Sequence, residues 1–451
     1  MRWHAGVILP VRFKLSASHT LSLEHYDSEY PQSRQRAQNA YLRGGNFVDS
    51  HAPALRGLPA GLPRLVPVDR KLFPDGLRTS GQHPPIDGQL RHFEEFPREI
   101  TGPTVWTPEQ MVDHPEEWIH NWTEVELDEL RQAVEGFIIS GTLLVSINKN
   151  NFRLPTLEST LQDIRNDILN GRGFIVFRGL PISRWGRYKA AVATMGLSVH
   201  FGYLLSQNKL GLILGHVTNQ GADYQNSLDK IKISATNAPQ FYHTDETDIV
   251  GLLFCAPGET GGASGCASAH TVWNALMKER PDVAKTLASP IWYVDRKGEV
   301  TDGQEPWFKN PVFMVEPGGK ERVYVKWDPY FVKSLARFSD KGLIPPLSAE
   351  QLEAMQVLEE TCQRNGIVYD CEIGDIQFVS CCQTFHSRTG FTDPPPPQPQ
   401  RYLLRTWIGT PEHEGGWCLP FHDSCYPKRG GIQVDNTPPA ADPLTTAGGT
   451  E

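Results

Sequence analysis

The sequence predicts an α+β protein in which flanking helices cover a core of β-strands. Residues 123–201 mostly show the three- and four-residue apolar spacing of helices, whereas from about residue 211 the pattern is mostly that of strands. The two kinds of element do not alternate in the strand–helix–strand order that builds a parallel sheet. A block of helices followed by a block of strands is typical of an α+β fold with a β core.

The first two predicted helices precede a buried strand. Thr123 and Glu126 form a capping box at the start of the first helix. The second helix runs into an apolar strand over residues 174–177, which Gly179 and Pro181 end. The apolar faces of the two helices are Leu127, Leu130, Val134 and Phe137, then Leu157, Leu161, Ile164 and Ile168.

Three more elements complete the expected fold. A helix is predicted over residues 188–201. Residues 312–315 and 322–327 flank a turn rich in glycine, which predicts a β-hairpin. A late helix is predicted over residues 349–365, with an apolar face of Leu352, Met355, Leu358 and Cys362.

Composition excludes several functional classes. The chain has 451 residues with 43 Lys and Arg against 52 Asp and Glu, so its net charge is 43 − 52 = −9. This acidic balance argues against a nucleic-acid partner, which would require a basic stripe. No run of about 18 apolar residues occurs, so no membrane-spanning helix is expected. The eight cysteines form no CxxC pair, which favours a cytoplasmic protein without a disulfide framework.

The ends of the chain differ from its middle. Residues 1–100 are rich in Pro, Gly, Arg and His and show no periodicity, so they are interpreted as an irregular N-terminal extension. Basic residues without an acid before Glu24 leave mitochondrial import open as an alternative. Residues 427–451 contain no aromatic residue and are expected to form a disordered tail.

The sharpest functional hypothesis is a metal site. Redox metals that activate oxygen favour two histidines and one carboxylate on one face, which leaves coordination positions open. A His-x-Asp pair on one strand points two ligands to the same side. His243 and Asp245 begin a strand-like run, and His386 lies in a later one. Three other pairs, His25-x-Asp27, His92-x-Glu94 and His114-x-Glu116, lie in irregular or helical surroundings and are interpreted as exposed polar residues.

An arginine downstream fits a co-substrate of such a metal. An open ferrous site needs a source of electrons, and 2-oxoglutarate would require a cation for its far carboxylate. Arg405 is suited to this because a guanidinium binds a carboxylate bidentately and keeps its charge when buried. Arg401 is expected on the same face of the same strand, with solvation at the mouth of the site as its alternative role.

Together these motifs resemble the taurine dioxygenase (TauD/TfdA-like) family, and especially its fungal branch with biosynthetic members. The resemblance covers about residues 101–426, which it implies form one dioxygenase domain. It rests on the ordered series of His243-x-Asp245, Gly261-Gly-Ala-Ser264, His386, and Arg401-x-x-x-Arg405. It implies a double-stranded β-helix (jelly-roll) core.

The resemblance also implies roles for individual residues. Fe(II) would be bound by His243, Asp245 and His386, and 2-oxoglutarate by Arg405 with help from Ser264. O₂ would be the oxidant, with ascorbate as a supporting reductant. Arg401 would contact the anionic group of the substrate. Cys381 and Cys382 stand where related sequences commonly have two asparagines, so they would line the substrate pocket or be two small buried thiols.

The sequence is therefore interpreted as an Fe(II)- and 2-oxoglutarate-dependent dioxygenase that oxidises an unactivated C–H bond. Its substrate would be a small, anionic or amino-acid-like metabolite of secondary metabolism. The product would arise by hydroxylation, desaturation or cyclisation. A homo-oligomer remains open, because taurine-type relatives associate. The alternatives are a jelly-roll protein that binds a ligand without turnover and a zinc hydrolase that uses the same three ligands.

Overall fold

The computed structural model describes residues 88–221, 232–317, 322–410, 412–420, 431–432, 434 and 437–443. They all belong to Pro63–Glu451, one of the two compact units into which the chain divides. Most of the predicted N-terminal extension, including His25, Asp27 and the basic first segment, lies outside the described residues. So does much of the predicted tail.

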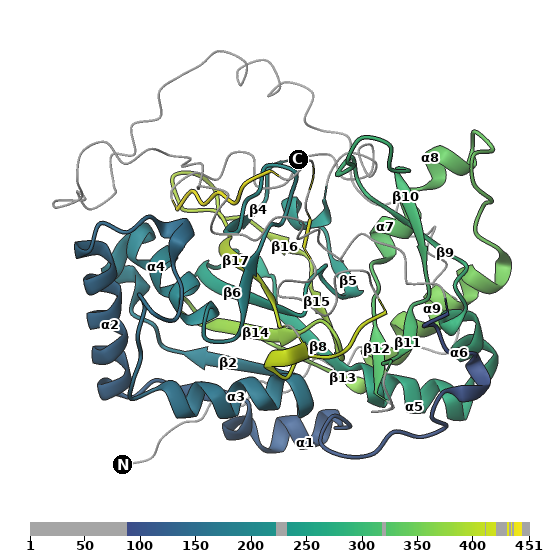
Figure 1. Cartoon of the computed structure of the whole chain (residues 1–451), viewed down its shortest axis with the longest axis horizontal. Helices are drawn as coiled ribbons and strands as arrows, with labels where there is room; N and C mark the ends of the chain where they lie inside the picture. The colour runs from purple at the N-terminus through teal and green to yellow at the C-terminus, as the bar shows by residue number, and fades with distance from the viewer. Residues whose placement is uncertain are drawn as a thin grey trace. The chain divides into compact units, whose positions relative to one another are not determined.

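A mixed sheet of seven strands forms the larger part of the core (Figure 1). Its strands follow the order β1-β2-β14-β6-β17-β3, and β4 also pairs with β17. Only β1 and β2 pair in parallel among these strands. The bounds are β1 Ile119–Asn121, β2 Phe174–Arg178, β3 Tyr203–Leu205, β4 Gly215–Thr218, β6 Ile249–Ala256, β14 Ile376–Ser380 and β17 Tyr402–Gly409.

A second, antiparallel sheet has four strands in the order β13-β8-β15-β5. Its strands are β5 Gln240–His243, β8 Ser264–Ser268, β13 Gly366–Tyr369 and β15 Thr384–Arg388. Three further strand pairs are β9 Trp292–Asp295 with β10 Trp307–Asn310, β11 Phe313–Val315 with β12 Val323–Val325, and β7 Thr260–Gly261 with β16 Phe391–Thr392. The β11–β12 pair confirms the predicted hairpin.

Helices cover the two sheets from outside, which confirms the predicted mixed fold (Figure 1). Helices α3 and α4 pack against strands of the larger sheet, and α5 and α9 pack against strands of the smaller one. The helices are α1 Pro108–Asp113, α2 Glu124–Ile139, α3 Glu158–Asn170, α4 Ile182–Ser198, α5 Ala269–Glu279, α6 Pro281–Ala288, α7 Pro329–Lys333, α8 Ala336–Ser339 and α9 Ala349–Asn365. Short 3-10 helices are Phe93–Glu95, Pro115–Glu117, Leu144–Ser146, Ile233–Ala235 and Glu412–Glu414.

Most predicted helices form at the expected places, with two differences. Helix α2 begins at the predicted capping box of Thr123 and Glu126, and α9 has the predicted bounds. Leu352 of α9 is 45% exposed, however, so it lies outside the buried face of this helix. Helix α4 begins at Ile182 rather than near residue 188, and Gly186 interrupts its helical geometry with a φ of 74°.

One apolar cluster joins the two sheets. It contains Val250, Val379 and Trp407 from the larger sheet with Cys266 and Ile367 from the smaller sheet. The inner faces of both sheets therefore enclose a shared, largely apolar interior. Side chains that point into it are removed from water, which strengthens their electrostatic interactions.

Parts of both predicted ends pack against this fold. Phe96, within the predicted extension, stacks on Trp273 with ring centroids 5.0 Å apart. In the predicted tail, Ala440 bridges to Leu212, and the backbone oxygen of Asp442 accepts a hydrogen bond from His216 at 2.7 Å. These tail residues are bound to the fold, in contrast to the disorder that their composition predicts. No helix in the described part of the chain has the length and apolar character needed to cross a bilayer.

Candidate metal centre

The smaller sheet brings the two predicted histidine ligands together. His243 ends β5, and His386 lies in the middle of β15. The two residues are direct partners in the antiparallel pairing of these strands, and their ring centroids are 4.1 Å apart. Asp245 follows β5 by two residues, so the short motif supplies two ligands and the neighbouring strand supplies the third.

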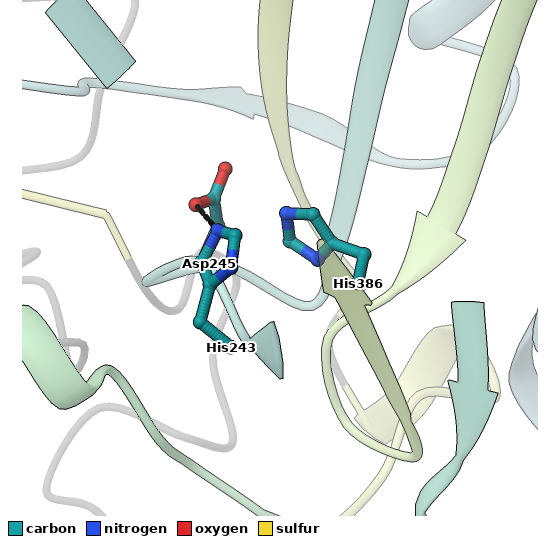
Figure 2. Close-up of side chains that lie close together, drawn as sticks. All are labelled: His243, Asp245 and His386. Atoms are coloured by element: carbon teal, nitrogen blue, oxygen red, sulfur yellow. Dashed lines mark ion pairs between the residues drawn. The ribbon is translucent and has the colours of Figure 1, made fainter. Parts of the chain in front are cut away.

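The three side chains converge on one point, as Figure 2 shows. One ligand atom from each of them lies within 4.8 Å of the others. His243 Nε2 and Asp245 Oδ1 are 3.7 Å apart. All three residues are nearly enclosed by protein: the side chains of His243 and Asp245 are 2% and 9% exposed, and His386 is 7% exposed.

The hydrogen bonds of the histidines fit a bound metal ion. His243 donates its Nδ1–H to the backbone oxygen of Phe241 at 2.8 Å. This bond makes Nε2 an acceptor, and the Gln240 amide donates to it at 2.9 Å. His386 Nδ1 is buried and has no hydrogen-bond partner among the described residues. A backbone acceptor behind a histidine ligand, as His243 has, is typical of a metal site.

The charges around the centre keep the ligands in the protonation states that a metal requires. Burial alone would raise the pKa of Asp245, but Arg405, His386 and His243 outweigh it and lower that pKa below its ordinary value. Burial, with further contributions from His243 and Arg405, lowers the pKa of His386 to about 3. Asp245 is therefore anionic and His386 is a neutral imidazole, as metal binding demands.

The other His-x-acid pairs do not form a comparable site. The side chains of His114 and Glu116 are 57% and 71% exposed, and His92 and Glu94 lie at an exposed 3-10 helix. Within residues that the structure describes, His243, Asp245 and His386 are the group of histidine, cysteine and acidic side chains that could hold a metal. His25 and Asp27 lie outside those residues.

Arg405 reaches the metal centre from the larger sheet. Its Nη1 lies 3.5 Å from Asp245 Oδ2, and its guanidinium lies 5.1 Å from the ring centroid of Trp407. Trp407 donates from Nε1 to the same oxygen of Asp245 at 2.8 Å. Trp407 was not predicted as a site residue, although it follows Arg405 by two positions and so shares its face of β17.

Arg401 lies in different surroundings from Arg405. Its Nη2 donates to the backbone oxygen of Gly262 at 3.3 Å, and its guanidinium lies 5.0 Å from the Phe391 ring. A bulge in the pairing of β17 with β6 falls between Tyr402 and Leu403. The extra residue is Cys255 of β6, and β17 pairs with β4 without interruption from Tyr402 to Arg405. The two-residue alternation of β17 is therefore intact, and the common face of the two arginines stays a prediction.

Ser264 and Arg401 share a neighbour in Cys371. Ser264 lies two residues after the Gly262 carbonyl that Arg401 contacts, and its Oγ is 3.9 Å from the thiol of Cys371. The same thiol interacts electrostatically with Arg401. Ser264 is also directly paired with Arg388. The role of Ser264 beside Arg405 stays a prediction.

The structure favours the alternative interpretation of Cys381 and Cys382, two small buried thiols. Neither residue has exposed surface. Cys381 belongs to the apolar cluster between the sheets, and the Cys382 thiol lies 3.7 Å from Asp248 Oδ1. A side chain without exposed surface does not line an open pocket, so the predicted contact with substrate is not supported.

Several other buried histidines and aromatic residues have structural roles. His216 and His270 are 3% and 1% exposed and use both ring nitrogens in hydrogen bonds. Trp292 and Trp327 pack edge to face at 5.4 Å in the core, and Tyr330 stacks on Phe241. Gln207, which contacts Arg405, was not predicted because nothing local distinguishes it, and 198 residues separate the two in the chain.

Comparison with known proteins agrees with this geometry. The taurine hydroxylase-like protein SAT17 of Stachybotrys chartarum is 24% identical over 337 residues, which cover 73% of this chain and 84% of the relative. FR-33289 synthase of Streptomyces rubellomurinus is 26% identical over 323 residues, 70% of this chain and 91% of the relative. A solved asparagine oxygenase, in complex with Fe(II), 2S,3S-3-hydroxyasparagine and succinate, is similar in fold with a TM-score of 0.52. It is 18% identical and covers 65% of this chain and 94% of its own.

Residues 140–407 match the family described as taurine catabolism dioxygenase TauD, TfdA family. This match spans more than half of the chain and includes the three converging ligands, Ser264 and both arginines. The predicted family is confirmed: the chain belongs to the TauD/TfdA family of dioxygenases.

Proposed function

We propose that this protein is an Fe(II)- and 2-oxoglutarate-dependent dioxygenase that oxidises a C–H bond of a small metabolite with an anionic group. The observation that carries the proposal is the enclosed convergence of His243, Asp245 and His386 within 4.8 Å. Two histidines and one carboxylate leave half of an octahedral metal's positions open for co-substrate, oxygen and solvent. The fold of the asparagine oxygenase supports the same assignment.

The three side chains would hold the iron. Bound there, Fe(II) would supply the activation of O₂, with conversion of 2-oxoglutarate to succinate and CO₂ and insertion of the second oxygen atom into the substrate. The protein's own residues supply orientation and the exclusion of water. Trp407 and Arg405 both contact Asp245 Oδ2, so they fix the carboxylate and leave Oδ1 turned toward His243.

We assign the two arginines in the reverse order from that expected on sequence. Arg401, with Ser264 close by, is the better candidate for the distal carboxylate of 2-oxoglutarate. Arg401 is 4% exposed and has no carboxylate within salt-bridge distance among the described residues. Burial lowers the pKa of Arg401 to about 10 despite the attraction of Asp393, which shows that burying this guanidinium is costly. An anion bound between Arg401 and Ser264 would remove that cost.

Arg405 is then the candidate for the substrate. It lies at the ligand Asp245 itself, so an anionic group bound to it would place a substrate beside the metal. The anion of an amino acid, a sulfonate or a related small acid would suit a single guanidinium. We also propose that the two facing sheets are the two faces of a double-stranded β-helix, which the shared apolar cluster supports.

Succinate release from purified, iron-loaded protein tests this function. With Fe(II), ascorbate and 2-oxoglutarate but no substrate, we expect slow succinate release. Release should be faster when a panel of amino acids, sulfonates and aryloxy acids includes the substrate. Anaerobic addition of 2-oxoglutarate to the iron protein should produce a visible charge-transfer band. A folded protein that binds neither iron nor 2-oxoglutarate would refute the proposal.

The same experiments separate the two alternatives. A zinc hydrolase would be active with zinc and without oxygen, and its zinc form would show no visible band. A protein that only binds its ligand would show the band but no succinate release with any compound or without one. The intact ligand set and the two buried arginines favour the enzyme.

A further inference from the structure

Gln207 holds the guanidinium of Arg405 in place. Its Oε1 accepts a hydrogen bond from Arg405 Nε at 2.8 Å, and its Nε2 donates to the backbone oxygen of the same arginine at 2.9 Å. Gln207 is 1% exposed. One side chain therefore contacts both the backbone and the head group of Arg405, which removes the freedom of a long side chain to rotate.

This contact decides which way Arg405 faces. Gln207 occupies the Nε side of the guanidinium, and the Trp407 ring lies against the group at 5.1 Å. The terminal nitrogens therefore point toward the metal centre, where Nη1 lies 3.5 Å from Asp245. The structure shows no hydrogen bond from Nη2 to any residue that it describes, so this donor is available to a ligand.

A glycine makes room for Gln207. Gly215 on β4 is the direct partner of Arg405 in the pairing of β4 with β17. A Cβ atom at Gly215 would lie 2.3 Å from Gln207 Oε1, which is too close for unbonded atoms. Any larger residue at this position would push the amide away from Arg405.

The backbone of Gln207 is itself anchored. Its N–H donates to the oxygen of Leu212 at 2.8 Å. Its carbonyl accepts from Lys232 Nζ at 3.2 Å, and the same ammonium lies 3.4 Å from Glu299. Lys232 and Glu299 are both buried. Because a buried charge pair with satisfied partners is rigid, Gln207 is fixed independently of Arg405.

We infer that Gln207 is a positioning residue for the substrate subsite, which orients Arg405 to bind one anionic group beside the metal. This inference rests on the proposed substrate role of Arg405. Gln207 does not contact the metal ligands in the structure, so its effect on the site is exerted through Arg405.

The test uses anion binding to full-length, zinc-loaded protein with 2-oxoglutarate present. The probes are acetate and methanesulfonate at constant ionic strength, and the readout is the shift in melting temperature. We expect both to stabilise the wild type. Gln207→Glu keeps the size of the side chain but places a carboxylate on Arg405, and Gly215→Ala displaces the amide. Each should weaken binding of the probes by about tenfold, the value of one charged hydrogen bond.

Affinity for 2-oxoglutarate, measured on the same proteins by calorimetry, distinguishes positioning from general damage. Both variants should bind 2-oxoglutarate as the wild type does, whereas a disturbed fold would weaken the binding of both 2-oxoglutarate and the anionic probes. Gly136→Ala is the matched control, because a Cβ there meets no atom within 4 Å. If the wild type showed no response to either probe, or if both variants responded like the wild type, the inference would be wrong. If the wild type bound neither zinc nor 2-oxoglutarate, that result would instead contradict the proposed function.

Discussion

His243 and His386 lie directly opposite each other across the antiparallel strands β5 and β15, with ring centroids 4.1 Å apart. In such a pair both side chains project from the same face of the sheet. The candidate metal centre is therefore a product of strand pairing, and its two histidines stand 386 − 243 = 143 positions apart in the chain. This relationship makes the site sensitive to changes in either strand.

Loss of a ligand should abolish metal binding without unfolding the protein. We expect His386→Ala to lose tight Mn(II) or Co(II) binding, measured by titration calorimetry, because two ligands cannot replace three. His386 Nδ1 has no hydrogen-bond partner among the described residues, so the substitution breaks no hydrogen bond of that atom. His114→Ala, at an exposed histidine, is the control and should bind metal normally.

Substitutions of the two arginines should affect the binding of different ligands. We expect Arg401→Met to weaken 2-oxoglutarate binding to the zinc-loaded protein by at least about tenfold, since a charge-assisted contact is lost. Arg405→Met should keep that affinity and lose the increase in succinate release caused by substrate. Arg131→Met, at an exposed arginine of α2, is the control. The opposite pattern would restore the assignment expected on sequence.

Two apolar residues of α2 should differ in their contribution to stability. Leu130 is fully buried, whereas Val125 is 68% exposed. We expect Leu130→Ala to lower the free energy of unfolding by about 2–5 kcal/mol through lost burial and a cavity. Val125→Ala should change it by less than about 0.5 kcal/mol. Equal decreases in the free energy of unfolding of the two variants, measured by urea denaturation, would mean that α2 does not pack as described.

Acid should destabilise the fold partly through His270. Burial lowers the pKa of His270 to about 4 from an ordinary value of 6.5. Its Nε2–H donates to Val323 at 2.9 Å, and Nδ1 accepts from Thr104 at 2.7 Å. As the pH falls, the unfolded chain takes up this proton before the folded protein does. The contribution of neutral, buried His270 to the free energy of unfolding is therefore complete above pH 6.5 and is lost as the pH falls toward 4.

The measurement is the free energy of unfolding as a function of pH. In His270→Gln, which cannot titrate in this range, the decline between pH 6.5 and 4 should be shallower than in the wild type, whatever its absolute stability. His114→Gln should leave the slope unchanged because His114 is exposed. A wild-type slope in His270→Gln would contradict the assignment.

Short-range sequence patterns were sufficient to predict several features of the fold. The capping box at Thr123 and Glu126, the bounds of α9 and the β11–β12 hairpin depend on residues close together in the chain. His243 and Asp245 were identified for the same reason, because two residues on one strand face the same side. The choice of His386 and the family itself depended on several motifs in a fixed order.

Only the tertiary structure decided which of these residues act together. Arg401 contacts the Gly262 carbonyl and Arg405 contacts Asp245, and both partners lie more than 100 residues earlier in the chain. Gln207 meets Arg405 across 198 residues of sequence. Local pattern thus determined the elements and the chemical types of the ligands. Strand register and long-range packing determined their partners, because those contacts depend on which strands lie side by side.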